Sequence, residues 1–311
     1  MTDLRLIDEV FNLSNHIMKT TKHVRLNSGR MTDCVEAMLK EPREEKQVDD
    51  KKINMSDNTT SNIILEELVA DSVNYCYWQF NSGYRPIDAG STKMRNLLDS
   101  NFESDRALMS NINLAAELRN FYSAMVRNRF PLMDKRLTHL NALTRCSLYQ
   151  SASNMHSYES AKCVAMDMVD IVQGGYPMQT AFKNLVSRVD GFGEDPFLKR
   201  AILFFLQLNR ILGLYEEEIK ILPIPADYQV PKIMNGLGLF TYTPPLNEKI
   251  INGEHLQENG PEEMSIRAAA IQVASILGEE TGWSPSEVDG WFFARRKNTN
   301  SPFHCCITSN Y

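Results

Sequence analysis

Apolar residues recur along most of the chain at the three-to-four-residue spacing of amphipathic helices. The clearest stripes lie in residues 64–80, 106–129, 135–172 and 195–213. Alternation of apolar and polar residues, which is typical of strands, is confined to residues 239–243 and the last residues of the chain. The pattern predicts a mostly α fold, with residues 1–311 forming one compact helical domain that has at most a few short strands.

Start and stop signals define the limits of the helix in residues 195–213 and predict two further helices. Asp195 can cap a helix that has proline at its first position, and Gly213 offers a left-handed stop. A second helix is predicted over residues 261–278, since it opens with proline and two glutamates. Residues 284–287, SPSE, form a capping box that opens a third helix, which we expect to run to about Lys297.

Residues 41–61, EPREEKQVDDKKINMSDNTTS, interrupt the helical pattern. This segment is charged and polar, with almost nothing to bury, and it is therefore predicted to be a loop or disordered insertion.

Composition narrows the class of function. The net charge is -6, and no long block of lysine and arginine occurs. A protein that follows a nucleic-acid strand usually presents a basic face, so direct nucleic-acid binding is not expected. A small anionic substrate needs only two or three local cations and stays possible.

The cysteines and the apolar runs indicate whether the chain binds a metal and where in the cell it is located. The six cysteines include no Cys-x-x-Cys pair, which favours scattered free thiols over a metal site. No apolar signal core opens the chain, and no run of 18 apolar residues occurs. We expect a cytoplasmic protein that has no membrane contact, no metal and no cofactor.

The most informative polar residue lies in residues 225–233, PADYQVPKI. Pro231 is tolerated only in the first turn of a helix, so Asp227 fits the N-cap of a short helix that ends at the turn of residues 236–238. Backbone N–H groups and the positive helix end keep a carboxylate ionised there. On spacing alone, a plain capping aspartate is the commoner interpretation.

Several segments, in the same order, resemble a known family. They are residues 21–24, 73–78, 195–201, 225–233, 260–263, 266–267, 288–289 and 302–304. These segments, which span nearly the whole chain apart from residues 41–61, are similar to the queuosine salvage family of queuosine 5′-phosphate N-glycosylase/hydrolases. The Pro-x-Asp-x-x-Val-x-Lys-Ile pattern also resembles, more distantly, the catalytic-aspartate segment of helix-hairpin-helix DNA glycosylases.

The resemblance implies an N-glycosyl hydrolase with a helical fold similar to those glycosylases. The expected substrate is queuosine 5′-monophosphate, and the products are queuine, for reuse in tRNA modification, and ribose 5-phosphate. Cleavage passes through an oxocarbenium-like state, which a carboxylate beneath the sugar stabilises, and this role falls to Asp227. Because queuine is a 7-deazaguanine without a ring N7, activation must come from hydrogen bonds to other edges of the base.

The same resemblance implies substrate contacts for residues in the matching segments. The candidates are His23, Asn74, Trp78, Lys199, Pro225, Tyr228 and Asp289. Asn74 and Trp78 are four residues apart and are expected on one helix face, with Asp71 one turn earlier. Lys199, at a helix start, is the proposed contact to the 5′-phosphate, with pairing to Asp195 or Glu194 as the plainer alternative.

The remaining candidates have plainer interpretations too. Asp289 could bind the guanidine-like edge of the base or be a helix-start aspartate. Trp78 could stack on the base or be a core residue. His23 is held as a contact to the base or the sugar, although a lone histidine is more often structural.

Two other functions stay open. A helix-hairpin-helix-type DNA or RNA base glycosylase would keep Asp227 but needs a glycine-rich hairpin upstream, where residues 213–224, GLYEEEIKILPI, supply acidic charge instead. A non-enzymatic nucleotide-binding helical protein would keep the same pocket without turnover. The sequence does not predict an oligomeric state.

Overall fold

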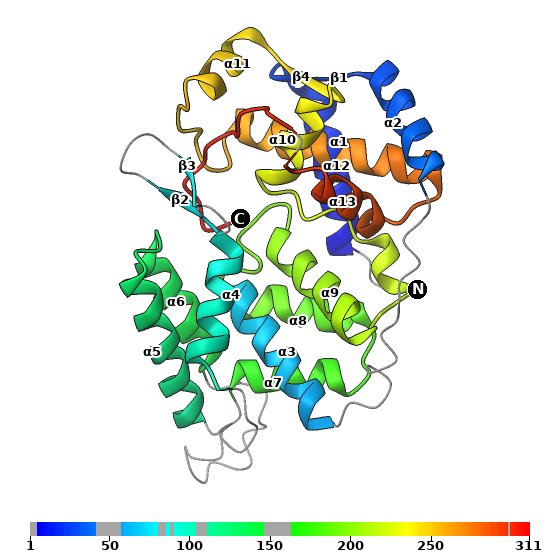
Figure 1. Ribbon diagram of the computed structural model, residues 1–311. Helices are drawn as coiled ribbons and strands as arrows, with labels where there is room; N and C mark the ends of the chain where they lie inside the picture. The colour runs from blue at the N-terminus through cyan, green and yellow to red at the C-terminus, as the bar shows by residue number, and fades with distance from the viewer. Residues whose placement is uncertain are drawn as a thin grey trace.

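The computed structural model describes residues 5–41, 57–79, 85–87, 90–103, 111–145, 163–297 and 299–311. The helical prediction is confirmed, and the helices form two tiers within one compact domain (Figure 1). The upper tier holds α1 (Arg5–Thr20), α2 (Ser28–Lys40), α10 (Gln229–Gly236), α11 (Pro244–Ile251), α12 (Pro261–Thr281) and α13 (Pro285–Ala294). The lower tier holds α3 (Asp57–Ser72), α4 (Gly90–Asn101), α5 (Asn111–Arg127), α6 (Met133–Leu143), α7 (Val164–Gln173), α8 (Met178–Arg188) and α9 (Lys199–Leu212).

Each tier is built round one buried helix. In the upper tier, α12 packs against α1, α2, α10 and α13. In the lower tier, α3 packs against α4, α6, α7 and α9. One hydrophobic cluster runs through both tiers, from Ile7 and Ile271 above to Leu68 and Phe205 below.

The strands of the described residues form two small antiparallel pairs. β1 (Val24–Leu26) pairs with β4 (Phe240–Tyr242), where strand pattern was expected in residues 239–243. β2 (Trp78–Gln79) pairs with β3 (Arg85–Pro86). A short 3-10 helix, η3 (Glu218–Ile221), precedes the segment that leads to α10.

A second cluster of buried residues joins the tiers beside the C-terminus. Its members are Tyr75, Cys76, Trp78, Tyr228, Cys305, Cys306 and Tyr311. The backbone N–H of Cys76 donates to the Tyr311 carbonyl at 2.9 Å, which ties the chain end to the segment after α3. Figure 1 shows the C-terminus lying between the tiers, near β2.

The end of α3 corrects one prediction. The helix stops at Ser72 instead of near residue 80, so Asn74 and Trp78 do not share a helix face. The reason lies in Arg136, whose guanidinium donates to the carbonyls of Val73, Tyr75 and Cys76. These side-chain donors replace helical N–H groups, and the chain leaves the helix with Cys76 at a φ of 49°.

The other helix limits differ by a few residues. α3 begins at Asp57, inside the segment predicted to be a loop, while residues 42–56 lie outside the described residues. α12 continues past Gly278 to Thr281, and α13 has the predicted capping box but ends at Ala294. Parts of the predicted helical stretches 106–129 and 135–172, namely residues 106–110 and 146–162, also lie outside the described residues.

The start of α9 also differs. Leu198, and not Asp195, is the N-cap of α9, although the Asp195 carboxylate accepts the N–H groups of Phe197 at 3.1 Å and Lys199 at 2.8 Å. The helix begins only at Lys199, because Leu198 has a left-handed backbone with a φ of 52°. Gly213 ends it in the left-handed conformation that was expected.

Among the described residues, every helix is too short or too polar to cross a membrane. The cytoplasmic location stays a prediction.

Candidate active site

Asp227 comes just before α10, at the end of a buried, non-helical segment that includes Pro225 and Ala226. Its carboxylate accepts the N–H of Gln229 at 2.6 Å, and Pro231 lies in the first helical turn as predicted. The N-cap of α10 is Tyr228 and not Asp227 as predicted; Asp227 lies one residue earlier and accepts the N–H of the first helical residue. The carboxylate of Asp227 thus lies at the start of α10, against a backbone N–H donor.

Asp289 lies in the second turn of α13, whose start is fixed by the capping box of Ser284 and Glu287. Burial, together with the negative charge of Asp227, raises the pKa of its carboxyl to about 7 against the opposing charge of Lys199. The two carboxylates are therefore close enough to interact. At neutral pH, Asp289 holds a proton for a large part of the time.

Lys199 is buried at the first position of α9, and its ammonium donates to the Asn74 carbonyl at 3.3 Å. Burial lowers its pKa, and the charges of Asp227 and Asp71 oppose that shift. The Asp195 carboxylate accepts a hydrogen bond from the backbone N–H of Lys199 and not from its ammonium group. The ammonium group instead points to Asn74. Lys199 thus lies among carboxylates from both tiers.

Asn74 is bonded at both ends of its amide. The amide nitrogen donates to Asp71 at 3.0 Å, and the amide oxygen accepts from the Tyr77 hydroxyl at 3.0 Å. Burial raises the pKa of Asp71 to about 6, against the opposing charge of Arg95, whose guanidinium lies 3.9 Å away. These residues form the lower wall of the site.

Trp78 and Tyr228 belong to an aromatic cluster beside Asp227. Their ring centroids lie 5.1 Å apart, and Phe303 packs edge-on against both rings. Trp78 is 2% exposed, and within the described part of the chain its indole N–H has no hydrogen-bond partner. The cluster includes a buried donor that a ligand or water would satisfy.

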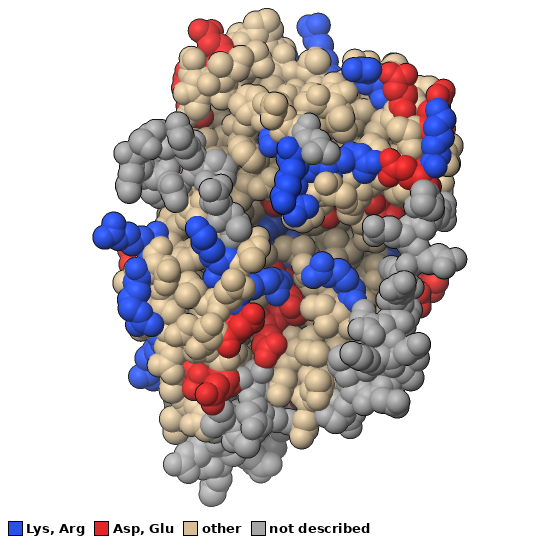
Figure 2. All heavy atoms as spheres, in the orientation of Figure 1, with Lys and Arg blue, Asp and Glu red and all other residues tan. Residues whose placement is uncertain are grey.

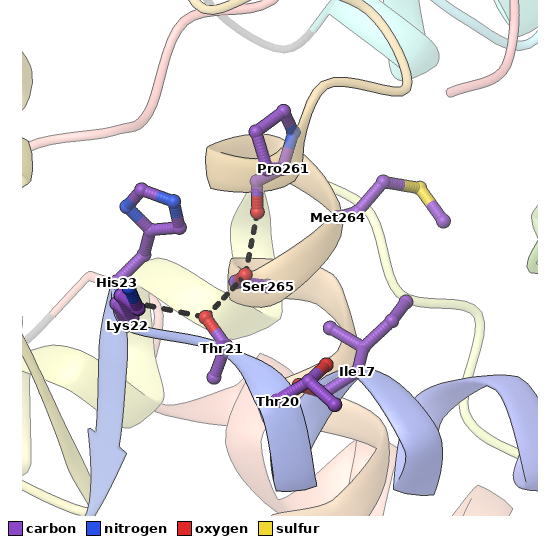
Figure 3. Close-up of a pocket in the computed structure, with 8 residues that line it drawn as sticks. All are labelled: Ile17, Thr20, Thr21, Lys22, His23, Pro261, Met264 and Ser265. Atoms are coloured by element: carbon purple, nitrogen blue, oxygen red, sulfur yellow. Dashed lines mark hydrogen bonds between the residues drawn. The ribbon is translucent and has the colours of Figure 1, made fainter.

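His23 lies in another place. It lines a small hollow with Ile17, Thr20, Thr21, Lys22, Pro261, Met264 and Ser265, which Figure 3 shows beside the start of α12. The hydroxyls of Thr21 and Ser265 are 2.7 Å apart at its base. None of the other candidates lines this hollow, so the contact of His23 with the base or the sugar stays a prediction.

Sequence reasoning missed Asp71 as a charged member of the site, Phe303 as part of the aromatic cluster, and Arg267. Phe303 and Arg267 fall in segments that resemble the family but were assigned no role. Arg267 is fully buried and bonds to the backbone beside Asp227. A buried arginine in a helix of small apolar residues is a signal that could have found it.

The middle of the molecule, where the tiers meet, carries charges of both signs on the face in Figure 2.

A family model described as queuosine salvage protein matches residues 52–289, which include Asp71, Asn74, Lys199, Asp227 and Asp289. The chain belongs to the queuosine salvage protein family. His23 and Phe303 fall outside the part that matches this family.

One curated relative is the queuosine 5′-phosphate N-glycosylase/hydrolase of Sphaerobacter thermophilus. It is 27% identical over 217 residues, which cover 66% of this chain. The match spans 65% of the relative's length, just under two thirds. Membership of the queuosine salvage family confirms the resemblance that the sequence segments predicted. The likeness to helix-hairpin-helix glycosylases stays a prediction.

Proposed function

We propose that this chain hydrolyses the N-glycosidic bond of queuosine 5′-monophosphate and releases queuine and ribose 5-phosphate. One observation carries the proposal. Two carboxylates, Asp227 and Asp289, lie close together around a buried lysine inside the segment that matches the queuosine salvage family. Paired carboxylates suit cleavage of a glycosidic bond, the activity in the name of the Sphaerobacter relative.

The two carboxylates suit different parts of the reaction. Breaking the bond between C1′ and the ring nitrogen leaves positive charge on the sugar, which ionised Asp227 stabilises. Water supplies the hydroxyl that C1′ gains, and a proton ends on the released ring nitrogen. Asp289, protonated for part of the time near neutral pH, can donate a hydrogen bond to an edge of the base.

The proposed substrate is a free nucleotide, with no direct contact to nucleic acid. The net charge of -6 opposes binding of a long phosphate backbone. Residues just upstream of the site include Glu217 and Glu218, where a glycosylase hairpin would need glycine and a free backbone. We propose no cofactor and no metal for this hydrolysis, because charge stabilisation and water suffice for the bond that breaks.

The test is incubation of the purified chain with queuosine 5′-monophosphate, followed by chromatography for free queuine. We expect release of base and ribose 5-phosphate in equal amounts. Binding of the nucleotide without any base release would contradict the enzyme and support the non-enzymatic alternative. Base release from duplex or single-stranded DNA, with none from the nucleotide, would favour the DNA glycosylase.

A further inference from the structure

Arg267 extends from the second turn of α12 into the junction between the tiers, and its side chain is fully buried. Its guanidinium uses all three nitrogens. Nε donates to the Ala226 carbonyl at 2.9 Å, Nη2 donates to Asp195 at 2.6 Å, and Nη1 donates to Glu263 at 3.1 Å. The guanidinium carbon also lies 4.3 Å from the centroid of the Tyr311 ring.

Two of these bonds end beside residues of the site. Ala226 shares its peptide bond with Asp227, so the carbonyl that Arg267 holds fixes the peptide plane entering Asp227. On the other side, the Asp195 oxygen that accepts from Arg267 also accepts the backbone N–H of Lys199 at 2.8 Å. One side chain therefore connects the upper-tier carboxylate to the lower-tier lysine.

We propose that Arg267 is a positioning residue that sets the distance between Asp227 and Lys199 across the two tiers. This inference rests on the proposed function, in which Asp227 stabilises the charge on the sugar. Arg267 is enclosed by protein and acts through the backbone of Ala226 and the carboxylate of Asp195. A misplacement of about 1 Å at a reacting group can cost roughly a hundredfold in rate.

The planar fork of arginine explains why this position holds arginine. Three acceptors lie in different directions round the guanidinium, and a lysine ammonium on a flexible stem does not hold that geometry. The carboxylates of Asp195 and Glu263 compensate the buried charge. A lysine at position 267 keeps the positive charge but loses the fixed directions of the three hydrogen bonds. The Arg267→Lys variant therefore tests positioning separately from charge balance.

The experiment compares Arg267→Lys with wild type in the full chain, using queuosine 5′-monophosphate. We expect kcat per folded molecule to fall at least ~10-fold, with KM within about 3-fold, because alignment is lost while binding contacts stay. The matched control is Arg188→Lys, which alters an arginine–aspartate pair of 2.7 Å between α8 and α7 in the lower tier. The control should lose thermal stability and keep the kcat of wild type.

A second variant, Asp195→Ala, covers the case in which Arg267→Lys does not fold. It removes the carboxylate oxygen that Arg267 and the Lys199 N–H share, and kcat per folded molecule should fall in the same way. By contrast, Glu263→Gln keeps an acceptor for Nη1 and should retain most of kcat. A kcat within 2-fold of wild type in folded Arg267→Lys, or in folded Asp195→Ala, would overturn the inference.

One readout does not depend on activity. The pKa of Asp289 depends on its distances to Asp227 and Lys199, so carboxyl NMR titration of Asp289 should give a shifted pKa in Arg267→Lys. An unchanged titration would contradict positioning even if the chain released no base at all. Absence of base release by wild type would contradict only the proposed function.

Discussion

The segment before α10 and the second turn of α13 each present an aspartate to the same lysine, in opposite surroundings. The carboxylate of Asp227 precedes its helix and accepts the N–H of Gln229. Asp289 lies inside its helix, past the free N–H groups, and within the described residues its carboxylate accepts no hydrogen bond. Burial and the nearby charge of Asp227 raise the pKa of Asp289 to about 7.

In the proposed function, this difference separates two chemical roles. A helix start stabilises a negative charge, and one further turn into the helix removes that stabilisation. Identical side chains can then act as a charge stabiliser and as a proton holder in one site. Substitutions of either carboxylate, or of the lysine between them, test this difference.

The largest effect is expected for Asp227→Asn. Replacing the charge with a neutral amide should lower turnover at least ~10²-fold, because the stabilisation of the sugar cation is lost. Folding and nucleotide affinity should change little, as measured by thermal unfolding and titration calorimetry. Asp134→Asn, which alters an exposed aspartate in the first turn of α6, is the matched control and should keep full turnover. Near wild-type turnover in Asp227→Asn would remove it from the central role.

Lys199→Met should have the next largest effect, about 10-fold on turnover. A buried ammonium among carboxylates balances their charge, so we expect the rates for nucleotide and nucleoside to fall by the same factor. Because Lys199 lowers the pKa of Asp289, the variant should also hold the Asp289 proton to higher pH. The measurement is kcat/KM for both substrates. A loss confined to the nucleotide would support the phosphate contact predicted from sequence.

The sequence was informative where local signals decide structure. The helix start at Ser284, the stop at Gly213 and the place of Asp227 at the start of α10 all follow from residues within a few positions. The segment after α3 could not be predicted in this way, because Arg136, more than 50 positions later in the sequence, donates hydrogen bonds to the carbonyls of Val73 and Cys76. Local spacing indicated a continuing helix there, and a tertiary contact overrode it.

The site shows the same division. The family segments identified Asp227, Lys199, Asn74 and Asp289, which the structure brings together. They could not show that His23 lines a hollow beside the start of α12. The raised pKa of Asp289 depends on burial and on Asp227, 62 positions away in the sequence, so no local pattern indicates it. The role of Arg267 depends in the same way on contacts between tiers.

The smallest effect on maximal rate is expected for Asp289→Asn, which tests the proton on this side chain. A carboxyl with a pKa near 7 is protonated below that pH, so wild-type turnover should fall as pH rises through about 7. The amide of asparagine can still donate a hydrogen bond to the base, and it does not titrate. Turnover of Asp289→Asn should therefore stay within about 10-fold of wild type at pH 6 and show no fall between pH 6 and 8. A fall of the same size and midpoint in both proteins would assign the titration to another group.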